Sequence, residues 1–179
     1  MGLSVSTLLT RSCALSNLST PFVGKVINAP KVKSVNREHK GTVQSIEDIN
    51  KVVRWVSNQG WNVIFEKKGD TGVVPALRNV VIDSSVSRDN QLYSILHEAG
   101  HIMTFNRSDY TEKFPNGYIR YAGKTNKKSD LHKFDVLIEE VTAWQEAERI
   151  AEHLGIALNK KNFHIERNKS LKTYTCWIV

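Results

Sequence analysis

Apolar residues at helical spacing mark the start of a folded region near residue 43. Ser45, with Asp48 three residues later, is typical of a capping box at the beginning of a helix. The apolar positions that follow lie three or four residues apart, at Ile46, Ile49, Val53 and Val56. We therefore expect a helix from Ser45 to about Gln59, ended by Gly60 in the left-handed conformation.

Two short segments after this helix have the pattern of β-strands. Residues 61–65 alternate as a half-exposed strand does, whereas residues 80–82 are continuously apolar, as in a more buried strand. The sequence Gly-Asp-Thr-Gly at 69–72 predicts a turn or loop between them. The sequence thus predicts a small sheet that follows the first helix.

Two longer helices are predicted in the second half of the chain. Ser87 or Asp89 can cap the first of them, whose apolar stripe consists of Leu92, Ile95, Leu96, Ala99 and Met103. The second is strongly periodic from about Asp135 to His153 or Leu154, and Gly155 ends it. We expect a long loop over residues 105–134, and a short helix or strand after Gly155 that packs on the core. Helices and a small sheet in this order define an α+β fold.

The first 42 residues differ from the rest of the chain. They are rich in Ser, Thr, Leu and Lys, and they show no sustained helical or alternating period. Residues 1–43 carry six basic residues against Glu38 alone, which accounts for most of the net charge of +7. We interpret residues 1–42 as a basic, largely extended arm that could contact nucleic acid. Its first residues fit a myristoylation pattern and also resemble a transit peptide.

The amino-acid composition narrows the class of protein to which this chain can belong. A chain of 179 residues, 40% hydrophobic and 24% charged, is typical of one globular domain. No run of 18 apolar residues occurs, so a membrane-spanning helix is not expected. Cys13 and Cys176 are the only cysteines and lie near opposite ends, which excludes a disulfide framework and favours a cytoplasmic location. The oligomeric state is left open.

Residues 97–101 form a His-Glu-x-x-His motif on the predicted helix that Ser87 or Asp89 caps. Spacing of four places His97 and His101 one turn apart, so two neutral imidazoles can bind one metal ion. Glu98 lies about 100° around the helix from His97, where it can reach a metal-activated water and act as the general base. The motif therefore predicts zinc-dependent hydrolysis of a peptide bond.

A hydrolytic zinc site usually has three protein ligands, so a third is expected outside the motif. The extended metzincin motif requires Gly and then His after the second motif histidine, but this chain has Thr104 and Arg107 there. That class is excluded. The remaining candidates are three glutamates of the last predicted helix and a histidine just before it: Glu139, Glu140, Glu146 and His132.

Helical geometry ranks these candidates. Glu140 interrupts an otherwise apolar stripe made of Leu137, Trp144, Ala147, Ala151 and Leu154. Because a buried carboxylate needs a partner, Glu140 ranks first. Glu139 shares a side with Asp135, Thr142 and Glu146, which we interpret as a solvated face, so Glu139 ranks second and His132 third. Four residues of the predicted loop could stabilise an oxyanion: Tyr110, Tyr118, Tyr121 and His132.

The order of helix, strands, motif helix, loop and Glu140-Val141-Thr142-Ala143-Trp144 resembles a small gluzincin-type zinc metallopeptidase. It is most similar to ImmA/IrrE-like proteins and their phage-borne relatives, over roughly residues 45–155. The resemblance implies a minimal zincin-like domain within residues 43–179. It also implies that His97, His101 and Glu140 are zinc ligands and that Glu98 is the catalytic base. The helix-turn-helix partner domain of that family is not evident in this sequence.

Three functions follow as hypotheses. The first is a zinc endopeptidase that acts on a protein or peptide, with the strand before the motif helix pairing with extended substrate. The second is a non-catalytic zincin-fold scaffold or nucleic-acid-associated protein that acts through the basic arm. The third is a metal-dependent hydrolase or amidase with a substrate other than protein.

Overall fold

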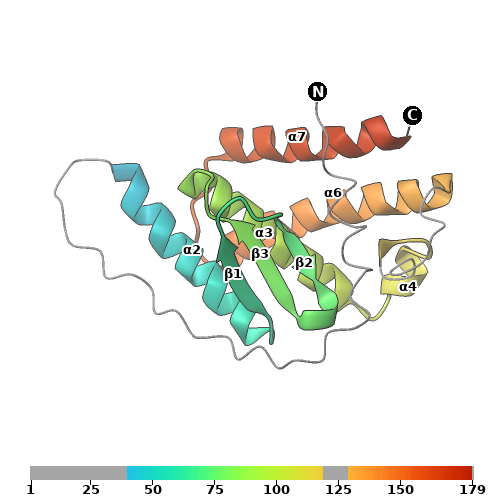
Figure 1. Ribbon diagram of the computed structural model, residues 1–179, viewed down its shortest axis with the longest axis horizontal. Helices are drawn as coiled ribbons and strands as arrows, with labels where there is room; N and C mark the ends of the chain where they lie inside the picture. The colour runs from blue at the N-terminus through green and yellow to red at the C-terminus, as the bar shows by residue number, and fades with distance from the viewer. Residues whose placement is uncertain (1–39, 119–128, 179) are drawn as a thin grey trace.

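The computed structural model describes residues 40–118 and 129–178, which adopt an α+β arrangement (Figure 1). Within these ranges lie five α-helices, one short 3-10 helix and three strands. Their order is α2 (Lys40–Asn58), β1 (Asn62–Glu66), β2 (Gly72–Val74), the 3-10 helix (Pro75–Leu77), β3 (Asn79–Asp83), α3 (Arg88–Phe105), α4 (Tyr110–Lys113), α6 (Asp130–His153) and α7 (Lys160–Ile178). The predicted α+β class is confirmed.

Several predictions fall on residues that are not described. The basic arm lies outside the described residues up to position 39, and so does Tyr121. The predicted contact of the arm with nucleic acid therefore stays a prediction. Among the helices that the structure does describe, none combines the length and apolar composition needed to cross a membrane.

Helix α2 begins earlier than predicted and ends close to the predicted position. Its first residue is Lys40, so Ser45 lies inside the helix and is not its N-cap. Asp48 forms an ion pair with Lys51 at 2.9 Å instead of closing a capping box. The helix ends at Asn58, and Gly60 follows with a φ of 79°, a conformation that glycine adopts without strain.

The sheet has three strands in the order β1-β3-β2, one more than predicted. Strand β3 pairs in parallel with β1 and antiparallel with β2, and Val80 and Ile82 of β3 are fully buried. Strand β2 was missed because it has only three residues, which directly follow a turn signal. Because β3 has a partner on each side, the prediction that the strand before the motif helix pairs with substrate is wrong. Among the described strands, β1 and β2 form the edges of the sheet.

Helix α3 carries the motif and lies behind the sheet in Figure 1. Ser87 is its N-cap, and the Ser87 hydroxyl accepts a hydrogen bond from the backbone N–H of Asn90 at 3.3 Å, as predicted. The helix packs against the sheet, α2, α6 and α7, with its most extensive contact on α6. Met103 was predicted to belong to the apolar stripe, but it is 36% exposed at the far end of the helix.

The region predicted as one long loop is partly helical. Helix α4 lies within it, and α6 begins at Asp130, five residues before the predicted start, with the Ser129 hydroxyl as its N-cap. Periodicity did not locate this first turn because its apolar residues, Leu131 and Phe134, are exposed. The predicted end of α6 at His153 is confirmed, and Gly155 has a positive φ of 64°.

Helix α7 runs alongside α6 and is longer than the predicted short element (Figure 1). It spans 19 residues, and it also contacts α3. Phe163 anchors it in the core, where its ring meets Tyr93 and Trp144 edge-on. The core is thus shared by the sheet and by α2, α3, α6 and α7.

Candidate metal centre

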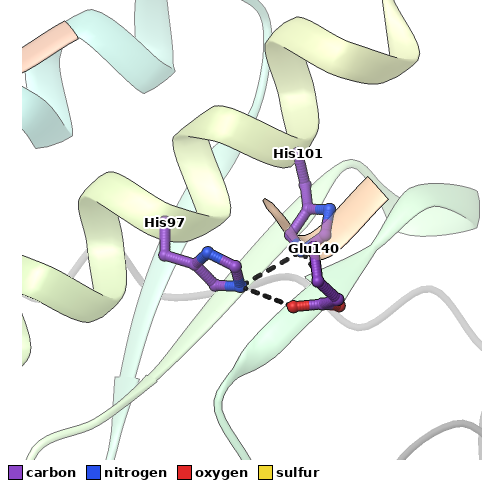
Figure 2. A group of neighbouring side chains, drawn as sticks. All are labelled: His97, His101 and Glu140. Atoms are coloured by element: carbon purple, nitrogen blue, oxygen red, sulfur yellow. Dashed lines mark hydrogen bonds and ion pairs between the residues drawn. The ribbon is translucent and has the colours of Figure 1, made fainter. Parts of the chain in front are cut away.

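The two motif histidines project from successive turns of α3 toward the same point (Figure 2). Both are buried, and their Nε2 atoms lie 3.2 Å apart. Imidazoles four residues apart on an α-helix share one face, so the helix itself sets this separation. The predicted convergence of His97 and His101 is confirmed.

Glu140 reaches the histidines from α6, as the apolar stripe predicted (Figure 2). Its side chain is 2% exposed, and Oε2 lies 3.2 Å from Nε2 of His97 while Oε1 lies 3.5 Å from Nε2 of His101. Ligand bonds of about 2.0–2.1 Å in a tetrahedral site give edges of about 3.3–3.4 Å. The three buried side chains are therefore spaced to hold one metal ion.

The same carboxylate has an unsatisfied atom. Oε2 of Glu140 is buried and has no hydrogen-bond partner among the described residues. A buried carboxylate oxygen without a hydrogen-bond donor is costly, and a positive charge beside it, from a protonated imidazole or a bound cation, lowers that cost. This observation, together with the two-nitrogen, one-oxygen donor set, fits a metal ion.

Electrostatics within the group also favour a positive charge at its centre. Burial alone would lower the pKa of His101, but the adjacent Glu140 carboxylate outweighs it and raises that pKa to about 9. Burial alone would raise the pKa of Glu140, yet His101 and His97 hold it well below its usual range. Without a metal, a proton on His101 therefore neutralises the carboxylate, and a metal ion competes with that proton.

Close packing of α3 on α6 brings the carboxylate within reach of the histidines. Gly100, between the two histidines, lies so near α6 that a Cβ atom would stand 2.1 Å from the carbonyl oxygen of Ala143. Trp144, one turn after Glu140, stacks on the His97 ring with 4.4 Å between ring centroids. Any larger residue at position 100 would push the two helices apart.

Glu98 lies beside the group and is not one of its three members. Its side chain is buried, and burial raises its pKa above the ordinary value, against the opposing effect of His97 and His101. The backbone of Val73 in β2 also hydrogen bonds to this carboxylate. Glu98 therefore stands between the histidines and an edge strand of the sheet.

The predicted solvated face of α6 is wrong. Glu139 is fully buried, and Thr142 and Glu146 are buried as well. The segment around α4 covers this side of the helix: Tyr110 donates its hydroxyl to Oε1 of Glu139, and the backbone N–H of Tyr118 donates to Oε2 at 2.8 Å. Hydrogen bonds thus occupy both carboxylate oxygens, and Glu139 is not part of the histidine group.

His132 is likewise not part of the metal-binding group. It lies on α6 and is buried, with Nδ1 2.6 Å from the backbone oxygen of Asn116. Asp135, one turn later, accepts a hydrogen bond from the backbone N–H of Asn116 at 2.7 Å. Residues 132, 135 and 139 therefore form a polar stripe on α6 that holds the covering segment in place.

Two tyrosines complete the surroundings of Glu140. Tyr118 donates its hydroxyl to Oε1 of Glu140 at 2.7 Å, and the hydroxyl of Tyr174 in α7 lies 3.3 Å from that of Tyr118. Tyr118 was one of four predicted candidates for a role at the site, whereas Tyr174 was missed. No spacing in the sequence links Tyr174 to the motif, since it lies on a separate helix.

Comparisons with models of protein families, with curated protein sequences and with solved structures find no match to this chain.

Proposed function

We propose that this chain is a zinc-dependent peptidase in which His97, His101 and Glu140 hold the metal and Glu98 is the general base. The observation that carries the proposal is the spacing of the three buried donor side chains, with donor atoms 3.2–3.5 Å apart. A second buried glutamate, Glu98, lies beside this group and supplies the general base that hydrolysis requires.

The donor set favours zinc among the common metals. Two imidazole nitrogens and one carboxylate oxygen in a near-tetrahedral arrangement are typical of catalytic zinc sites that keep a fourth position open. Calcium and magnesium prefer oxygen ligands in larger numbers, which this group does not supply. When bound, zinc would act as a Lewis acid that polarises a carbonyl group and makes water nucleophilic near neutral pH.

Glu98 is suited to move the proton in this reaction. Burial shifts the pKa of Glu98 upward, toward neutral pH, and a general base is most efficient when its pKa lies near the pH at which it works. Glu98 would accept the proton of the attacking water and later deliver it to the departing amine nitrogen. The carboxylate then returns to its starting state.

Strand β2 is the proposed docking edge for substrate, in place of β3. It pairs with β3 on one side only among the described strands, and Val73 at its centre contacts the Glu98 carboxylate. An extended peptide that pairs with an edge strand places its backbone carbonyls along that edge. The peptide bond to be cleaved would thereby lie near Glu98.

The experiment compares Glu98→Gln with Glu152→Gln, a matched change at an exposed glutamate of α6. Both proteins are incubated with a mixture of unfolded proteins, and new N-termini are counted by mass spectrometry. We expect Glu98→Gln to keep its zinc and to lose about 10²–10⁴-fold in rate, because an amide accepts no proton. Glu152→Gln should match the wild type. Cleavage by Glu98→Gln within about tenfold of wild type would contradict the proposal.

A further inference from the structure

Three separate segments converge on the carboxylate of Glu140. The carboxylate itself comes from α6, the hydroxyl of Tyr118 from the segment after α4, and the hydroxyl of Tyr174 from α7. The two oxygens of Glu140 have different neighbours. Oε1 accepts the hydrogen bond from Tyr118 and lies 3.5 Å from Nε2 of His101, whereas Oε2 lies 3.2 Å from Nε2 of His97 and receives no hydrogen bond from the described residues.

Tyr118 is held firmly where it makes this contact. Its backbone N–H donates to Glu139, which is fully buried and also accepts the hydroxyl of Tyr110. The preceding residue, Gly117, lies so close to Glu139 that a Cβ atom would stand 2.7 Å from the carboxylate. Glu139 thus holds the backbone of Tyr118 in place, and the hydroxyl of Tyr118 contacts Glu140, the next residue of α6.

Tyr174 supports the tyrosine from the opposite side. Its hydroxyl lies 3.3 Å from the Tyr118 hydroxyl. A tyrosine hydroxyl is protonated at neutral pH, so each of them can donate a hydrogen bond. A carboxylate that receives a hydroxyl donor at one oxygen is oriented by it.

We infer that Tyr118, supported by Tyr174, positions Glu140 so that it presents only Oε2 to the metal ion. The inference rests on the proposed metal centre and goes beyond it, because it assigns a role to two tyrosines outside the ligand set. Partners behind the ligands of a metal ion commonly orient them and tune the metal. Here the hydrogen bond from the Tyr118 hydroxyl keeps Oε1 from binding the metal ion.

A one-atom carboxylate ligand has a consequence for the reaction. With two imidazoles and one carboxylate oxygen, a tetrahedral site has one position left for water or substrate. If both oxygens of Glu140 were ligands, the carboxylate would fill that position. Tyr118 and Tyr174 are therefore positioning residues that keep the site open.

The test uses Co²⁺ in place of zinc, because Co²⁺ reports its coordination through visible absorption. Wild type, Tyr118→Phe and Tyr174→Phe are titrated with Co²⁺ as full-length chains, and affinity and spectrum are recorded together. Tyr93→Phe is the control. Tyr93 lies on α3, and its ring is buried against Phe163 of α7. Circular dichroism verifies the fold of each variant.

We expect Tyr118→Phe to bind Co²⁺ about 10–100-fold more weakly than wild type. Its absorption should also weaken, because Oε1 becomes a second ligand atom and the coordination number rises. Tyr174→Phe should show the same changes to a smaller extent, and it carries the test if Tyr118→Phe does not fold. Tyr93→Phe should match the wild type.

Three results would overturn the inference. An unchanged affinity and spectrum in the tyrosine variants would show that the hydroxyls do not act on Glu140. Weaker binding with an unchanged spectrum would show a merely structural role. In both cases a wild type that binds Co²⁺ leaves the proposed metal centre standing, whereas a wild type that binds none overturns the proposed function and this inference together.

Discussion

Glu139 and Glu140 are adjacent residues of α6 with the same side chain and nearly the same burial, 0% and 2% exposed. Their carboxylates nevertheless have different surroundings. Both oxygens of Glu139 accept hydrogen bonds from the segment that covers α6, from Tyr110 and from Tyr118. Glu140 accepts one hydrogen bond from Tyr118 at Oε1, and its two oxygens face the motif histidines, Oε1 toward His101 and Oε2 toward His97.

The difference shows that burial alone does not mark a metal ligand. A buried carboxylate whose oxygens all have hydrogen-bond donors is already satisfied and serves to hold the structure. Glu140 keeps one oxygen that receives no hydrogen bond and lies 3.2 Å from an imidazole nitrogen, where a proton or a metal ion can supply the balancing positive charge. Burial raises the pKa of Glu139 to about 7, whereas the histidines hold that of Glu140 well below its usual range.

The largest expected effect comes from removing each carboxylate in turn and measuring zinc affinity. Glu140→Ala should lose most of its affinity, because one of three ligands is gone. Glu139→Ala should still bind one zinc per chain. Competition with a chromophoric chelator measures both values. Loss of zinc in Glu139→Ala but not in Glu140→Ala would reverse the assignment of the two residues.

The pH dependence of zinc binding sharpens the electrostatic side of the comparison. In the metal-free protein the pKa of His101 is raised to about 9, so below that pH a proton must leave before the metal binds. Zinc affinity should therefore rise about tenfold per pH unit from pH 7 to 9 and then level off. Chelator competition at a series of pH values measures the slope. A flat profile over this range would contradict the raised pKa.

Glu139→Ala should reduce stability although it keeps the metal. The change removes the acceptor of the Tyr118 backbone N–H and one acceptor of the Tyr110 hydroxyl, and a buried donor that loses its acceptor costs about 1–3 kcal/mol. Urea denaturation measures the free energy of unfolding. Glu148→Ala, at a partly exposed position of the same helix, is the control and should change little. Equal stability of the two variants would mean that Glu139 does not hold the covering segment.

Gly100→Ala tests the helix contact on the Glu140 side. The new methyl group would meet backbone atoms of Ala143, which cannot rotate away, so we expect a loss of about 1–3 kcal/mol in stability and weaker zinc binding. Gly72→Ala is the matched control, since a Cβ atom there meets nothing within 4 Å. Denaturation and chelator competition on both variants decide the result. Unchanged values in Gly100→Ala would show that α3 and α6 need not approach so closely.

Much of the candidate site could be predicted because its signals are local. Spacing of four fixes His97 and His101 on one face of a helix, and the apolar stripe of α6 places Glu140 inward. The cap at Ser87 and the end of α6 before Gly155 follow from short-range chemistry in the same way.

The rest depends on contacts between distant segments, which periodicity does not report. Glu139 was predicted to be solvated because the pattern of α6 alone does not show that residues 110–118 cover it. Tyr174 was missed for the same reason, since α7 meets the site only after folding. Strand β2 was missed because it gains its strand character by pairing with β3, with three residues of its own.

The most direct test of the metal centre is the zinc content of the purified chain, prepared without chelator and determined by elemental analysis, beside that of His97→Ala. We expect one zinc per wild-type chain. In His97→Ala, which lacks one of the two imidazoles that lie 3.2 Å apart, we expect little or none. Full zinc content in both proteins, or none in the wild type, would contradict the assignment of His97, His101 and Glu140 as a zinc site.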